Sequence, residues 1–347
     1  MMTQWHEFLA SQGAVLADAQ VRSFGDEPGE LQAAAAGNVI ADLSHLGLIQ
    51  VEGADAPTFL QGQVTSDIRQ LDGSNSHYAG YCTPKGRMLA LFLAFAQQDR
   101  IYLQLNGALL EPIMKRLKMY VMRSKAVITD ASDNMVRIGL AGEQASAALH
   151  ELFAQVPEKT HEFVTLENGA LLRLPGPAPR YELFCDPSQA AAIWTKLAQH
   201  HRPVGKTSWE WLEIQAGIPD ITPQTQEAFV PQMVNLDTLG GINFKKGCYT
   251  GQEIVARTQY RGILKKRMAI AHVDEATPAP GQSVYSPAFG EQSAGTVANV
   301  APAPEGGYDF LVVAQIEGLR AGSLRLGSPD GAPIAIRSHP PLDAAPR

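Results

Sequence analysis

Residues 244–253 read Phe-Lys-Lys-Gly-Cys-Tyr-Thr-Gly-Gln-Glu, and this run carries most of the chemistry that the sequence offers. Two glycines bracket Cys248, which predicts a tight loop whose backbone can approach a ligand closely. Thr250 lies three residues before Glu253 and precedes an apolar periodic run, the spacing of a capping box at a helix start. We therefore expect Cys248 to lie just ahead of a helix N-terminus and beside two lysines.

A helix N-terminus and neighbouring lysines both stabilise a thiolate, so Cys248 is a candidate reactive thiol. From the residues alone, an unreactive Cys248 that is buried as a small hydrophobic side chain is an equally supported alternative, because that is the usual state of a free cysteine. The other cysteines, Cys82 and Cys185, lie far away in the sequence, and three cysteines suggest neither a disulfide framework nor a zinc site. One copy of the chain cannot supply four cysteine ligands to an iron–sulfur cluster, so we expect no intrinsic metal site.

The order of the predicted elements indicates an α+β protein of two or three domains. Short strands and helices alternate up to Arg267, with helices predicted over 3–12, 143–154 and 187–200 and a hairpin-like turn at 83–86. Short β-like runs separated by Gly and Pro follow Arg267. These later runs, which predict a small β-barrel or sandwich, are 268–273, 293–300, 309–316 and 333–337.

Composition excludes several classes of protein. Hydrophobic residues make up 45% and charged residues 18%, as in ordinary globular proteins. The formal charge of −7 argues against a protein dominated by nucleic-acid binding. No apolar run is long enough to span a bilayer and the N-terminus has no secretion signal, so we expect no membrane contact and a cytoplasmic location.

Residues 244–253, called here the signature segment, resemble the signature of the YgfZ family, the folate-binding relatives of the glycine-cleavage T-protein. Residues 59–67, called here the upstream segment, read Phe-Leu-Gln-Gly-Gln-Val-Thr-Ser-Asp and resemble the family's N-terminal part. The resemblance extends from about residue 43 to 267. Further matching stretches are 51–55, 216–219, 229–232, 235–236, 239–242, 260–262 and 266–267.

The resemblance implies a fold of the aminomethyltransferase folate-binding type. Three α+β and β domains would form a ring, with the β-barrel at the C-terminus. Residues 1–45 with 130–262 would form a discontinuous central folate-binding domain, 46–129 an inserted α+β subdomain, and 263–340 the barrel.

The resemblance also implies a function. The chain would bind tetrahydrofolate and act as an accessory factor for synthesis or repair of iron–sulfur proteins, including tRNA-modifying enzymes, through Cys248. Its partners would be folate and iron–sulfur client or assembly proteins, and contact with tRNA has weak support. The candidate cofactor-binding residues are Trp209, Gln215, Lys246, Gly247, Tyr249, Gln252, Glu253 and Arg257.

Two departures bear on catalysis. Relatives commonly have glutamate where this chain has Gln215, which hydrogen-bonds but carries no charge. The transferases use an aspartate on the strand that follows Arg87, whereas residues 88–95 here contain no carboxylate. A transferase would therefore lack its polar group, and we expect an accessory role rather than catalysis. A folate-dependent aminomethyl transferase and a tRNA-binding regulatory protein are the alternatives.

Aromatic and basic residues supply further candidates. Trp209 could stack on a pterin, but packing in the core is an open alternative for Trp209 and is favoured for Trp211. Two basic clusters could meet an anionic ligand tail or RNA phosphates, and we favour a solvated helix face for the first and ligand binding for the second. The first cluster is Lys115, Arg116, Lys118, Arg123 and Lys125, and the second is Arg257, Arg261, Lys265, Lys266 and Arg267.

Overall fold

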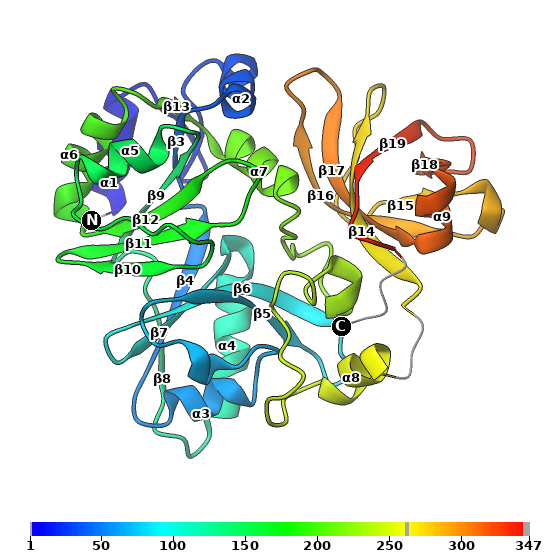
Figure 1. The fold of residues 1–347 in the computed structure, drawn as a ribbon, viewed down its shortest axis with the longest axis horizontal. Helices are drawn as coiled ribbons and strands as arrows, with labels where there is room; N and C mark the ends of the chain where they lie inside the picture. Colours follow the sequence, from blue (N-terminus) through cyan, green and yellow to red (C-terminus); the bar gives the residue numbers. More distant parts are fainter. Residues whose placement is uncertain (1, 261–263, 343–347) are drawn as a thin grey trace. The chain divides into compact units, whose positions relative to one another are not determined.

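A computed structural model describes residues 2–260 and 264–342 (Figure 1). The chain divides into two compact units. Unit 1 contains Met1–Ala56, Leu71–Ser76 and Ala94–Ala216, and unit 2 contains Pro57–Gln70, His77–Leu93 and Gly217–Arg347. Helices and strands are mixed and a closed barrel ends the chain, which confirms the predicted fold class. The division into three domains stays a prediction.

Unit 1 is organised around a six-stranded sheet of order β10-β11-β12-β9-β3-β13. Its neighbours are antiparallel except β13 and β3, which run parallel. The strands are β3 (Val39–Asp42), β9 (Val136–Ala141), β10 (Phe163–Leu166), β11 (Gly169–Leu174), β12 (Arg180–Cys185) and β13 (Arg202–Val204).

Helices α1 (Met2–Ser11), α5 (Ala145–His150) and α6 (Pro187–Leu197) pack together beside this sheet (Figure 1). Trp5 of α1 and Trp194 of α6 meet edge to face with ring centroids 5.6 Å apart. The buried indole N–H of Trp5 donates to Asp42 at 2.8 Å. These helices lie where the sequence predicted them, although α5 and α6 end earlier because their last predicted residues form turns.

Helices α2 (Glu27–Ala36) and α7 (Lys206–Gln215) contact one another in the same unit. Asp26 caps α2 by accepting from the N–H of Gly29 at 3.2 Å, and Pro28 lies in its first turn. No helix was predicted at α2, although an Asp followed two residues later by Pro is a typical helix start. α7 packs closely on β9, because a Cβ at Gly139 would lie 2.6 Å from the ring of Trp209.

A five-stranded sheet has the order β5-β6-β7-β4-β8. The chain passes between the units within β5 and within β6. Thr83 to Gly86 form the predicted turn between these strands, closed by a bond from Gly86 N–H to Thr83 C=O of 2.9 Å. The strands of this sheet are β4 (Leu46–Glu52), β5 (Ser76–Cys82), β6 (Met88–Gln97), β7 (Arg100–Asn106) and β8 (Val127–Asp130). The chain also forms the helices α3 (Ala56–Gln61) and α4 (Leu110–Val121) and a separate hairpin of β1 (Val15–Ala17) and β2 (Gln20–Ser23).

Unit 2 ends in the closed barrel β14-β17-β16-β15-β18-β19 (Figure 1). All four predicted β-like runs are strands of this barrel. Of the two predicted alternatives, the closed sheet confirms the barrel and excludes the sandwich. Strands β15 and β18 were not predicted, because each is three residues long and too short to show a period. The elements are α8 (Gln252–Tyr260), β14 (Lys266–Val273), β15 (Ser283–Tyr285), β16 (Gly295–Pro302), β17 (Tyr308–Gln315), α9 (Ile316–Ala321), β18 (Leu324–Leu326) and β19 (Pro333–Ser338).

Candidate functional site

Lys246 braces the signature segment from inside unit 2. Its side chain is buried, and its ammonium donates to the carbonyl oxygens of Val64 at 2.6 Å and Ser66 at 2.7 Å. It also lies 5.0 Å from the ring centroid of Tyr249. Burial lowers the pKa of Lys246 to about 8. The sequence predicts that Lys246 stabilises the Cys248 thiolate. In the structure its ammonium instead donates two hydrogen bonds to the upstream segment.

The upstream segment is attached to the signature region at a second point. The hydroxyl of Thr65 donates to the carbonyl of Gly241 at 2.5 Å and accepts from the N–H of Gly80 at 2.7 Å. The N–H of Asn243 donates to the carbonyl of Thr65 at 2.9 Å. The two segments on which the family resemblance rests therefore form one hydrogen-bonded structure.

Two glycines allow the start of α8 to approach the turn between β5 and β6. Gly251 has φ of +84°, and a Cβ there would lie 2.5 Å from the carbonyl oxygen of Thr83. A Cβ at Gly86 would lie 2.9 Å from the Cβ of Ile254. Side chains at either position would clash, so this contact requires glycine on both sides. Gly247 differs, because no atom lies within 4 Å of its Cβ position.

Cys248 is the exposed cysteine of the three. Cys82 and Cys185 are buried, and burial raises the pKa of each thiol to about 12. Exposure excludes the buried-hydrophobe alternative for Cys248, and its reactivity stays a prediction. Exposure makes the sulfur accessible, which a thiol needs if it is to meet another molecule.

Helix α8 begins at Gln252, later than the sequence predicted. Among the described residues no capping box joins Thr250 and Glu253; the N–H of Thr250 donates instead to Gly62 at 3.3 Å. Tyr249, Thr250 and Gly251 therefore separate Cys248 from the helix. Of the remaining predicted residues, Tyr249 is buried, Gln252 is half-buried, and Glu253 and Arg257 are exposed.

Trp209 and Gln215 belong to unit 1 and lie on α7. Trp209 is only 1% exposed, and the guanidinium of Arg180 lies 4.8 Å from its ring centroid. Packing alone accounts for this tryptophan, and pterin stacking by Trp209 stays a prediction. Trp211, the residue favoured for the core, is half-buried. Gln215 is half-buried at the end of the helix.

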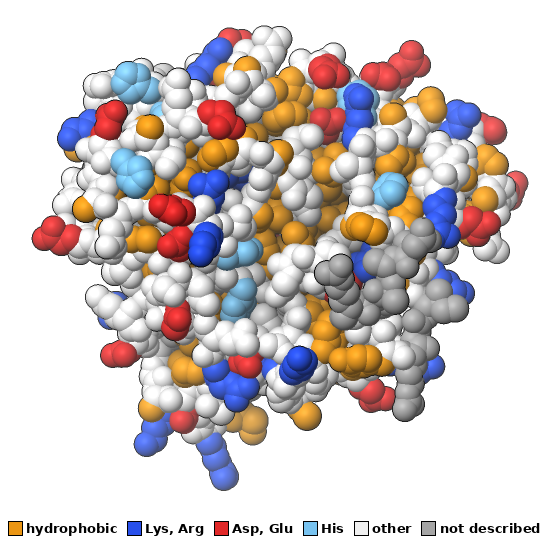
Figure 2. Space-filling model, viewed as in Figure 1, with side chains coloured by type: hydrophobic (Ala, Val, Ile, Leu, Met, Phe, Trp, Pro, Cys, Tyr) orange, Lys and Arg blue, Asp and Glu red, His pale blue; other side chains and the backbone are white. Residues whose placement is uncertain are grey.

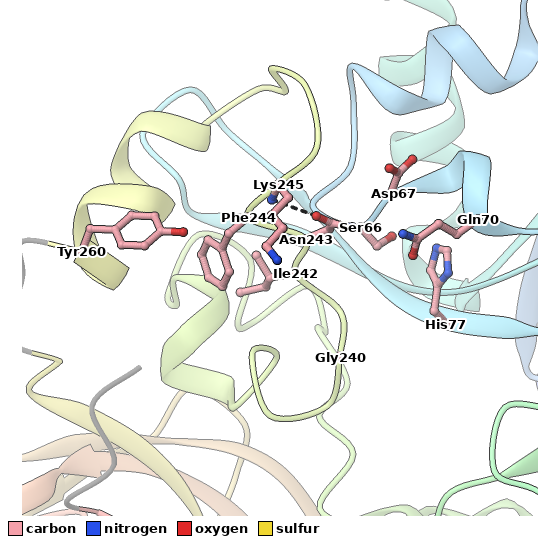
Figure 3. Close-up of a pocket in the computed structure, with 10 residues that line it drawn as sticks. All are labelled: Ser66, Asp67, Gln70, His77, Gly240, Ile242, Asn243, Phe244, Lys245 and Tyr260. Atoms are coloured by element: carbon pink, nitrogen blue, oxygen red, sulfur yellow. Dashed lines mark hydrogen bonds between the residues drawn. The ribbon is translucent and has the colours of Figure 1, made fainter. Parts of the chain in front are cut away.

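A cavity of about 320 Å³ lies in unit 2 beside the signature segment (Figure 3). The cavity was not predicted from the sequence, because its wall comes from segments far apart in the chain. Phe244 and Tyr260 meet there edge to face with centroids 5.9 Å apart. The residues that line it are Ser66, Asp67, Gln70, His77, Gly240, Ile242, Asn243, Phe244, Lys245 and Tyr260.

The first basic cluster agrees with the interpretation as a solvated face. Lys115, Lys118, Arg123 and Lys125 are exposed on α4 and the loop that follows it. Figure 2 shows acidic and basic side chains interspersed over most of the face it draws. No extended surface of one sign is visible on that face.

The second basic cluster is divided between the interior and the surface. Arg267 is buried and forms two bonds to Asp237, of 2.6 and 2.8 Å. Lys266 is half-buried and its pKa is lowered by burial, whereas Arg257 and Lys265 are exposed. Arg261 lies outside the described residues. The ion pair of Arg267 holds β14 to the loop before the signature segment, so this residue is structural.

Two absences concern the described residues alone. No group of three or more His, Cys, Asp or Glu side chains among them could hold a metal ion. None of their helices combines the length and the apolar character that crossing a bilayer requires.

Comparisons with known proteins agree with this geometry. Residues 24–244 match the family described as the GCVT N-terminal domain. A protein named "tRNA-modifying protein YgfZ" from Yersinia pseudotuberculosis serotype O:1b (strain IP 31758) is 36% identical over 246 residues, which cover 71% of this chain and 74% of that protein. A protein of the same name from Sodalis glossinidius (strain morsitans) is 36% identical over 229 residues, 66% of this chain and 70% of that protein.

The solved structure of the glycine cleavage system aminomethyltransferase T from Bartonella henselae superimposes with a TM-score of 0.79. It covers 99% of this chain and 98% of its own, at 17% sequence identity. The fold is therefore that of the aminomethyltransferases. At the level of sequence, the chain belongs to the YgfZ family, as the signature segment predicted.

Proposed function

We propose that this chain is a tetrahydrofolate-binding accessory protein that supports iron–sulfur enzymes of tRNA modification in the cytoplasm and acts through Cys248. The observation that carries the proposal is the exposed Cys248 on a segment braced at Lys246. Relatives that are 36% identical are named tRNA-modifying proteins, which supports the link to tRNA. A braced segment holds its thiol at a constant position, as contact with a client protein requires.

The residues fit a bound folate in part. Gln215 is half-buried and its amide can both donate and accept, which suits the polar edge of a pterin. Trp209 is enclosed and presents little surface to a ligand. Within unit 1, a folate would therefore bond to the amide of Gln215 rather than stack on the ring of Trp209.

An accessory role fits the sheet better than aminomethyl transfer. Strand β6 is buried from Met88 to Phe95, and these eight positions carry no ionisable side chain. A transferase must stabilise charge that develops at the folate, and that needs a placed polar group. If purified protein and tetrahydrofolate were given an aminomethyl donor and formed methylenetetrahydrofolate at an enzymatic rate, the transferase alternative would replace the proposal.

Two measurements test the proposal separately. Calorimetric titration with tetrahydrofolate should give saturable binding, and its absence would remove the folate part. Complementation of cells that lack the protein should fail with Cys248→Ser and succeed with Cys185→Ala, read out as activity of iron–sulfur tRNA-modifying enzymes. Melting curves of both variants show whether they are folded; full complementation by folded Cys248→Ser would remove the thiol from the function.

A further inference from the structure

We propose that the cavity beside the signature segment binds one unstacked nucleotide of an RNA chain. The inference rests on the proposed role in tRNA modification and names a site for it. Single-stranded RNA is recognised by stacking splayed bases on aromatic side chains, hydrogen-bonding their edges and neutralising their phosphates. The cavity carries each of these three elements.

The aromatic element is the pair Phe244 and Tyr260 (Figure 3). Their rings are inclined at 72°, so the edge-to-face contact leaves ring faces uncovered. Tyr260 is 69% exposed, which is unusual for so large a ring. An exposed aromatic at the mouth of a cavity offers a base a planar surface.

The polar element includes a buried hydroxyl. Ser66 is 2% exposed, it lines the cavity, and its Oγ has no hydrogen-bond partner among the described residues. An unsatisfied buried hydroxyl is costly, and a ligand that bonds to it recovers that cost. The Oδ1 of Asn243 accepts from the N–H of Lys245 at 2.8 Å, which orients the amide and leaves its NH₂ to donate.

Asp67 adds a fixed acceptor. Its carboxylate is held by two bonds of 3.0 Å from Arg69, and that side-chain contact lowers its pKa. Oδ1 also accepts from the backbone N–H of Arg69 at 3.2 Å, whereas Oδ2 accepts one bond from the Arg69 side chain and has a second lone pair, so Oδ2 can still accept from an N–H group of a base. Donor and acceptor groups on one wall suit a heterocycle better than an apolar ligand.

The charged element lies at the rim. Lys245 lines the cavity and is exposed, and the Arg69 side chain is 60% exposed beside Asp67. Arg257 is exposed three residues before Tyr260 on α8, so the two share a face of the helix. These cations can meet the phosphates on either side of a bound base.

The test is the binding of a fluorescein-labelled, single-stranded RNA to the full chain, measured by fluorescence anisotropy at constant salt. We expect saturable binding that Tyr260→Ala weakens about tenfold, the effect of losing one stacked base. Tyr260→Trp should restore binding because it restores a ring. Tyr120→Ala removes a partly exposed aromatic from α4, near the first basic cluster, and should change nothing.

A second variant examines the polar wall. Ser66→Ala should fold as well as the parent, since it deletes an unsatisfied hydroxyl, and should weaken RNA binding several-fold. Absence of saturable RNA binding would overturn the proposal, and so would unchanged binding by Tyr260→Ala. Weaker binding in Tyr120→Ala alone would move the RNA to α4 and overturn the cavity site.

Tetrahydrofolate titrations on the same samples separate this proposal from the function on which it rests. Tetrahydrofolate binding without RNA binding overturns the nucleotide site alone. RNA binding without tetrahydrofolate binding overturns the folate function and leaves the nucleotide site standing. If tetrahydrofolate displaces the RNA and Tyr260→Ala weakens both ligands, the cavity is a pterin site and the nucleotide assignment is wrong.

Discussion

The ammonium group of Lys246 donates to the backbone carbonyl of Ser66 at 2.7 Å, across 180 positions of sequence. This bond joins the signature segment to the upstream segment, and the same ammonium donates a second bond to the carbonyl of Val64. Cys248, two residues away, stays exposed. The lysine nearest the cysteine in sequence therefore shapes the segment that presents the thiol.

Lys246→Met should lower the free energy of unfolding by about 3 kcal/mol. The change leaves the carbonyls of Val64 and Ser66 buried without the donor that satisfies them. The exposed neighbour gives a matched control, since Lys245→Met should change stability by less than about 0.5 kcal/mol. Urea unfolding of both variants checks this, and equal stabilities would show that the ammonium does not brace the segment.

Gly251→Ala should destabilise the protein by at least about 2 kcal/mol. Its φ of +84° disfavours a side chain, and the new Cβ would meet the carbonyl oxygen of Thr83 at 2.5 Å. Gly247→Ala should be tolerated because its surroundings are open. Thermal melts distinguish the two. If folded Gly247→Ala lost tetrahydrofolate binding, Gly247 would be needed for close backbone approach to the ligand, as the sequence predicts.

The native protein should react with a thiol reagent at one cysteine first. Cys248 is exposed, whereas burial shields Cys82 and Cys185 and raises the pKa of each to about 12. Mass mapping after brief alkylation at neutral pH should find the label on Cys248, and urea should release the other two. Early labelling of Cys82 would contradict its buried place on β5.

Glu182→Gln should raise the free energy of unfolding above that of the parent protein, and this gain should be larger at neutral pH than at acidic pH. Burial raises the pKa of Glu182 from 4.5 to about 7, so the folded state holds a proton that the unfolded chain releases between these values. Stability from this group is therefore present below pH 4.5 and falls as the pH rises to about 7, by about 3 kcal/mol.

The measurement for Glu182 is the difference in unfolding free energy between variant and parent from pH 4 to 8. His45 acts in the opposite sense, because burial lowers its pKa to about 3, but it is present in both proteins and cancels. The difference should grow across pH 4.5 to 7. A difference that stays constant would mean that Glu182 titrates normally in the folded state.

Several elements were predictable because their signals are local. The helix at residues 3–12, the turn at Thr83 to Gly86 and the long barrel strands follow from periodicity and from turn residues. β15 and β18 were missed because three residues carry no period. Helix α2 was missed although Asp26 and Pro28 mark its start.

The sequence predicted which residues belong to the candidate site better than it predicted what their side chains do. The signature segment singles out Cys248, and motif spacing places two lysines beside it. Side-chain direction depends on neighbours distant in the sequence, so no local pattern indicates that Lys246 turns inward while Lys245 stays in water. The cavity that includes Asp67 and Tyr260 was missed for the same reason.

The family, the α+β class and the position of the candidate thiol follow from the amino-acid order alone, because they depend on residue identity and short-range spacing. The exposure of Cys248, the ion pair of Arg267 with Asp237 and the burial of Trp209 emerge only in the folded chain. Burial and pairing are properties of contacts between distant segments. A chain acquires them only when folding excludes water from those contacts.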